Sequence, residues 1–121
     1  MCVKPVDNVS FKAQHHLKTL WKKGLLPTVT KGFYGDELTI DTVSLEHLDP
    51  VSLGGRTIEE NLVLASKRKN NARGNKPLYL YTTMGQAWEY LVQFVDVKVQ
   101  GFDGNRYINR VMKKLKQLNI K

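Results

Sequence analysis

Cysteine is almost absent from this 121-residue chain, which contains only Cys2. A single cysteine excludes an intramolecular disulfide and any zinc site built on two or four cysteines. The chain also lacks an apolar run of membrane-spanning length, and its N-terminal stretch MCVKPVDNVS has no apolar centre like that of a signal peptide. We therefore expect an intracellular, cytoplasmic protein with no membrane partner and no structural zinc.

Internal repeats and low-complexity segments are absent as well. The composition, 41% hydrophobic and 25% charged, is that of an ordinary globular protein. A chain of this length can bury its own hydrophobic core without help from a partner. We therefore predict a single domain over residues 1–121.

Acidic residues are scarce outside one segment of the chain. The formal net charge is +8, but residues 36–60 carry seven acids and one base, a local charge of −6, so the remainder sums to +14. The bases gather in residues 66–76 and 106–121, and neither stretch contains an acid. Such an acidic island is either a solvated loop or a set of carboxylates that holds a divalent cation while flanking bases bind phosphates.

The hydrophobic pattern predicts helices at both ends of the chain and strands near its centre. Helical spacing indicates an N-terminal arm over 9–24, with Ser10 as its N-cap and Gly24 as its stop, and further helices over about 84–95 and 105–118. Alternation predicts one strand within 37–48, with Leu38, Ile40, Val43 and Leu45 on or near one face, and a second strand over 61–66. A short helix should follow over about 66–75, closed by Gly74. The expected fold class is α+β.

Three polar residues fall at the junctions of these central elements. His47 stands where the first strand ends, Asn61 where the second begins, and Asn70 on the short helix, at separations of 14 and 9 residues. Pro50, the pair Gly54–Gly55 and the pair Gly74–Asn75 complete a pattern over residues 45–78. This pattern resembles the HNH nuclease family, and the HNH domain of RNA-guided CRISPR nucleases has the same spacings.

The resemblance covers about a quarter of the chain and implies a ββα-metal core over about 37–78. Such a core is a two-stranded antiparallel hairpin and a short helix, flanked here by the N-terminal arm and C-terminal helices over about 83–118. The implied activity is that of a DNA endonuclease that leaves 5′-phosphate and 3′-hydroxyl ends. Glu46 replaces the usual Asp, and Ser66 and Lys69 stand where a second zinc-binding cysteine pair would be. The missing cysteines favour a zinc-free member of the family. By analogy with the family, the compact size without a recognition module favours a phage or mobile-element enzyme, which would act in the cytoplasm of a host cell.

Phosphodiester hydrolysis requires a base for water and a cation that neutralises developing charge. His47 titrates near neutrality and is the candidate general base. Glu46 and Asn70 offer hard oxygen ligands for Mg²⁺ or Mn²⁺. Following the family, Asn61 orients His47 and ties down the loop between the strands.

The loop and the basic stretch have expected roles too. Gly54 and Gly55 should allow the loop to turn with positive φ, while Pro50 stiffens its entry. The candidate phosphate contacts are Lys67, Arg68, Arg73 and Lys76. The carboxylates of Asp41 and Asp49 either supplement the metal site or are solvated or capping residues.

The sequence supports two hypotheses about function. The first is a DNA endonuclease that acts with one divalent metal, as a monomer or homodimer. The second is a non-catalytic nucleic-acid-binding module on a decayed HNH scaffold. Spacing alone does not separate the two.

Overall fold

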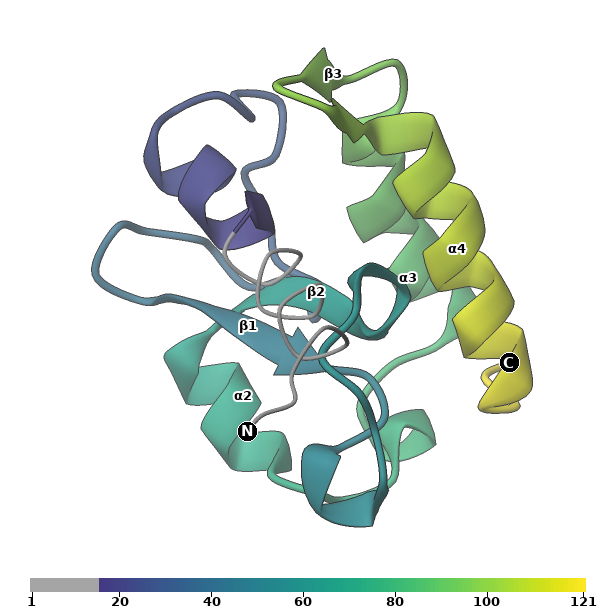
Figure 1. Cartoon of the computed structure of the whole chain (residues 1–121). Coiled ribbons are helices and arrows are strands. Elements are labelled where there is room, and N and C mark those ends of the chain that lie inside the picture. Colours follow the sequence, from purple (N-terminus) through teal and green to yellow (C-terminus); the bar gives the residue numbers. More distant parts are fainter. Residues whose placement is uncertain (1–15) are drawn as a thin grey trace, which may run out of the picture.

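The centre of the molecule is a two-stranded antiparallel hairpin followed directly by a short helix. The computed structural model describes residues 16–121 (Figure 1). Strand β1 (Val43–His47) pairs with β2 (Leu62–Ser66), with His47 opposite Leu62, and α2 (Lys67–Arg73) continues from β2. The predicted α+β class is confirmed.

Helices and short turns surround this hairpin. Figure 1 shows α2 and α4 on opposite sides of it. Residues 16–22 are helical, and the remaining elements are η1 (Val51–Leu53), η2 (Glu59–Asn61), η3 (Leu78–Leu80), α3 (Met84–Leu91), η4 (Val92–Phe94), β3 (Lys98–Val99), β4 (Phe102–Asp103) and α4 (Gly104–Gln117). Within the described part of the chain, no helix combines the length and apolarity needed to cross a membrane.

Several element boundaries follow local sequence signals closely. The Ser66 hydroxyl accepts a hydrogen bond from the Lys69 amide at the start of α2, and Gly74 adopts positive φ just after its end. Asp103 caps α4 in the same way through the amides of Asn105 and Arg106. The helices expected near 66–75 and 105–118 therefore lie within two residues of their predicted positions.

Other boundaries differ from the prediction. Only residues 43–47 of the first predicted strand pair with β2, because the hydroxyls of Thr39 and Thr42, 2.6 Å apart, close a turn before the strand. Ile40 is consequently 58% exposed rather than on the inner face. The helix predicted over 84–95 ends at Leu91 and tightens into η4, and the small β3–β4 hairpin was not predicted. The predicted cap Ser10 and residues 9–15 of the arm lie outside the described residues.

Strand β2 is buried along its whole length and is fixed by two tyrosines. The Tyr90 hydroxyl, from α3, accepts a hydrogen bond from the Leu64 amide at 2.9 Å. The Tyr107 hydroxyl, from α4, donates to the Leu62 carbonyl at 2.7 Å, and the two hydroxyls lie 2.9 Å apart. Burial raises the pKa of both phenols, so they remain neutral donors and acceptors. Helices α3 and α4 thus hold the strand that supports β1.

Candidate functional site

A cleft of about 340 Å³ opens where β1 ends, between η1 and α2. Three of the four polar residues singled out in the sequence, Glu46, His47 and Asn70, line it. Asn61 lies instead beneath the loop that forms one wall. The full lining comprises Glu46, His47, Pro50, Val51, Ser52, Asn70, Gly74 and Asn75.

Glu46 is the buried acid of this cleft, with an exposure of only 3%. Its Oε2 accepts a hydrogen bond of 2.5 Å from the Tyr34 hydroxyl and lies 3.5 Å from Arg73 Nη1. Burial raises the pKa of Glu46, although the Tyr34 hydrogen bond and the Arg73 charge oppose that shift. Burial and the Glu46 charge also raise the pKa of Tyr34, which keeps its hydroxyl a donor. Both contacts engage Oε2, so Oε1 is the oxygen through which the carboxylate could bind a cation.

His47 is half-buried at the last position of β1. Its Nε2 lies 2.9 Å from Thr57 Oγ1, within hydrogen-bond distance. Burial lowers the pKa of His47, and the nearby Arg73 charge lowers it further, so both effects favour the neutral imidazole. When Nε2 carries the ring hydrogen and donates it to Thr57, Nδ1 of the neutral ring has the free lone pair that can accept a proton.

Asn61 acts on the loop backbone. Among residues 16–121 its side chain makes three hydrogen bonds, all to main-chain atoms: Oδ1 accepts from the Asp49 amide at 2.8 Å, and Nδ2 donates to the carbonyls of Asp49 and Arg56 at 3.0 and 2.7 Å. These bonds join the start and end of the loop between β1 and β2. The histidine ring is contacted by Thr57 instead, so any effect of Asn61 on His47 passes through the backbone.

The two loop glycines are required for different reasons. Gly54 has φ of +98°, the left-handed conformation that glycine adopts without strain. Gly55 does not have positive φ; its amide donates to the Pro50 carbonyl at 2.9 Å, and a Cβ there would collide with the Asp49 carbonyl. The expectation of positive φ is therefore correct for Gly54 and wrong for Gly55, where space is the constraint.

Asn70 projects from α2 toward β1. Its Nδ2 donates to the Leu45 carbonyl at 2.9 Å and to the Ser44 hydroxyl at 3.2 Å. The carbonyl acceptor fixes the orientation of the amide, because only the nitrogen can donate to it. The amide oxygen thus remains available as a hard ligand at a cleft that Glu46 also lines.

The donor set fits a hydrated divalent cation. Within residues 16–121, no group of three or more His, Cys, Asp or Glu side chains gathers as a metal cage. Mg²⁺ is commonly held by one or two protein carboxylates and retains water or phosphate oxygens for its other positions. The Glu46 carboxylate and the Asn70 amide oxygen match that pattern.

Arg73 requires a correction, because it cannot serve as a phosphate contact. It is 1% exposed, and its guanidinium donates to the carbonyls of His47, Leu48 and Lys76 at 2.7, 2.9 and 2.9 Å. The sequence did contain a signal for this inward position. Arg73 is three residues after Asn70, and residues three apart lie on the same face of a helix, here the face toward β1. The other candidate phosphate contacts, Lys67, Arg68 and Lys76, are exposed.

The two acids considered as extra ligands lie apart from this cleft's lining. Asp41 is exposed in the turn before β1. The Asp49 carboxylate lies 3.8 Å from Lys114 Nζ of α4, and Asp49 also bonds Asn61 through its backbone. Both therefore have surroundings that account for them without a metal.

Comparisons with known proteins found no relative of this chain. No family model, no curated protein and no solved structure matches the chain.

Proposed function

We propose that the protein is a metal-dependent DNA endonuclease with an HNH-type ββα-metal core. The observation that supports this most directly is that Glu46, His47 and Asn70, spread over 25 residues of sequence, line one cleft. The order of elements, β1, loop, β2 and α2, is also the order that the HNH resemblance implies.

His47 is the proposed general base. It would take a proton from a water molecule through Nδ1 while Thr57 holds Nε2, and the water oxygen would then attack the scissile phosphorus. The bond to the 3′-oxygen breaks, and protonation of that oxygen completes hydrolysis to a 5′-phosphate and a 3′-hydroxyl. The lowered pKa of His47 keeps the ring neutral, the state in which it can accept a proton.

Glu46 and Asn70 are the proposed ligands of the divalent cation, Mg²⁺ or Mn²⁺. When bound, such an ion neutralises the charge that develops on phosphate and leaving oxygens. Tyr34 and Arg73 hold the Glu46 carboxylate from behind, and β1 holds Asn70 through the Leu45 carbonyl. Both ligands are thus fixed by their neighbours before any cation binds.

The exposed bases of α2 and the segment after it are the proposed contacts to DNA. Unlike the buried Arg73, these bases, Lys67, Arg68 and Lys76, are exposed to solvent. Exposed lysine and arginine side chains are the groups that bind DNA phosphates. Phosphate contacts position a protein without reading bases, so this set implies DNA binding and not a recognition sequence.

The test of this proposal is cleavage of supercoiled plasmid by the purified protein. We expect open-circular or linear DNA to appear with Mg²⁺ or Mn²⁺ and not with excess chelator. The order in which the two products appear reports whether one strand or both are cut in an encounter. Plasmid that is bound but never cut under any metal condition would instead favour the non-catalytic nucleic-acid-binding module.

Asn70 offers a test of the metal ligands with a matched control next to it. Asn70→Ala should lower the cleavage rate by at least about ten-fold and raise the Mg²⁺ concentration needed for half-maximal rate, because losing one ligand weakens metal binding. Asn71→Ala removes the same amide from an exposed position on α2 and should leave both quantities unchanged. Equal metal titration curves for the two variants would contradict the assignment of Asn70.

A further inference from the structure

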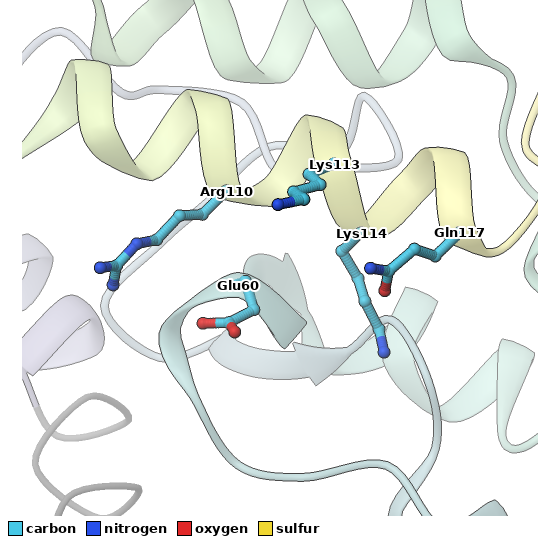
Figure 2. Close-up of a pocket in the computed structure, with 5 residues that line it drawn as sticks. All are labelled: Glu60, Arg110, Lys113, Lys114 and Gln117. Carbon is cyan, nitrogen blue, oxygen red and sulfur yellow. The ribbon is translucent and has the colours of Figure 1, made fainter.

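A second groove, lined by three cationic side chains, lies between α4 and the loop that joins β1 to β2. It has a volume of about 380 Å³ and is lined by Glu60, Arg110, Lys113, Lys114 and Gln117. Figure 2 shows Arg110 and Lys114 reaching from α4 toward the loop on either side of Glu60, while Lys113 lies along the helix above the Glu60 carboxylate. Three cations and one amide donor therefore line the groove, and Glu60 is the carboxylate of its lining.

The charges of this groove are only partly neutralised. Arg110 Nη1 lies 3.4 Å from Glu59, which also pairs with Arg106, and Lys114 Nζ lies 3.8 Å from Asp49; of these side chains Glu59, Lys114 and Asp49 are mostly buried. Lys113 and Glu60 form no ion pair with any described residue, and Lys113 is exposed. With Glu59 and Asp49 counted, the three cations of the lining face three carboxylates, and Lys113 is the lining cation that pairs with none of the described carboxylates.

The groove and the catalytic cleft border the same loop. Asp49, which contacts Lys114, directly precedes Pro50 of the cleft wall, and Glu60 directly precedes Asn61, which ties the loop together. Two phosphate contacts along one loop require a polymer with regularly spaced phosphates, whereas a small anion would occupy only one place.

We propose that this groove binds a backbone phosphate of double-stranded DNA at a distance from the scissile bond. The inference rests on the proposed function only for the identity of the polymer. Lys113 and Arg110 supply the direct contacts, and Lys114 and Gln117 complete the donor set. Glu60 opposes binding by its like charge and limits the strength of this contact.

Lys113 is the most direct test, because no described residue depends on it for an ion pair. A phosphate contact contributes a slope of about −0.9 to the dependence of log K on log[salt], which corresponds to about eight-fold in affinity at 0.1 M salt. We expect Lys113→Ala to weaken binding to a short duplex by about that factor and to reduce the slope by about 0.9. Fluorescence anisotropy in chelator, over about 50–200 mM salt, measures both without cleavage.

Lys116 provides the matched control. It is exposed on the same helix but does not line the groove, so Lys116→Ala should change the affinity by less than about two-fold. If Lys113→Ala and Lys116→Ala lowered the duplex affinity equally, the overall positive charge of the helix would explain binding, and the groove would not be a specific site. No effect of Lys113→Ala, or no binding of duplex by the unsubstituted protein, would overturn it too.

Glu60→Gln tests the same groove with the opposite sign. Removal of the like charge should tighten duplex binding by about three-fold, and an unchanged or weaker affinity would contradict the proposal. Calorimetry with inorganic phosphate distinguishes a small-anion site, since submillimolar binding that Lys113→Ala abolishes would overturn the assignment to DNA. The binding measurements need no cleavage. A protein that cleaves no plasmid would therefore refute the proposed nuclease, and the duplex affinities would still decide whether the groove binds DNA.

Discussion

Replacement of His47 by alanine is expected to lower the rate of plasmid cleavage by about 10²–10⁴-fold, the contribution of a positioned general base. Duplex affinity should stay within about two-fold, because the contacts that bind phosphates come from lysine and arginine side chains elsewhere. The measurement is the initial rate of supercoiled plasmid loss at saturating protein, alongside anisotropy on a short duplex in chelator.

His16 supplies the control for the His47 substitution. It is half-buried in the helix over residues 16–22, with its ring 6.3 Å from that of Phe102, and lies outside the cleft lining. His16→Ala therefore removes an imidazole of similar exposure without touching the proposed chemistry. Cleavage by His47→Ala at the rate of the unsubstituted protein would end its assignment as the base, whereas equal loss in both variants would indicate a general effect on folding.

Substitution of Arg73 should have the largest effect on stability. Arg73→Leu leaves the Glu46 carboxylate buried without its counter-charge and removes the donors to the carbonyls of His47 and Leu48. Breaking a buried pair by removing one partner costs about 3–5 kcal/mol. That is a large fraction of the roughly 5–15 kcal/mol by which domains are stable. Urea denaturation followed by circular dichroism measures the loss.

Three comparisons make the Arg73 result interpretable. Arg68→Leu removes the same charge from an exposed position on α2 and should change the free energy of unfolding by no more than about 0.5 kcal/mol. Arg73→Lys keeps a charge beside Glu46 but cannot form the same fork of hydrogen bonds, so its loss should be intermediate. Glu46→Gln combined with Arg73→Leu should recover part of the loss. A cost for Arg73→Leu no larger than that for Arg68→Leu would contradict its structural role.

Local patterns predicted much of the fold because they are governed by local physics. The amphipathic pattern of α4 and the end of α2 at Gly74 are set by residues within a turn or two of each other, and both appear where expected. The predicted start of β1 and the predicted end of α3 were wrong for a different reason. Ile40 alternates correctly for a strand, but β2 ends at Ser66, opposite Val43, and the pairing of strands cannot be read from periodicity.

The candidate site likewise contains residues that the sequence predicted and residues that it did not. His47 ends β1, Glu46 directly precedes it and Asn70 lies on α2, as the pattern indicates, and the structure brings all three to one cleft. Tyr34 and Thr57 were not found, because each reaches the site from a loop, at separations of 12 and 10 residues from its partner. Their hydroxyls carry no spacing signal of their own. Only the tertiary arrangement identifies them as the groups that hold the acid and the histidine.

The two walls of the cleft differ in how firmly they are held. The wall formed by β1 and α2 is fixed by Arg73 and by the buried strand β2, whereas η1 contributes no buried residue to the core. Free energies of local opening follow such differences in buried contacts, so η1 should exchange its amides far faster than β1 or β2. We therefore expect the cleft to widen around the proposed duplex by movement of the η1 wall alone, so that the distance between Glu46 and Asn70 need not change.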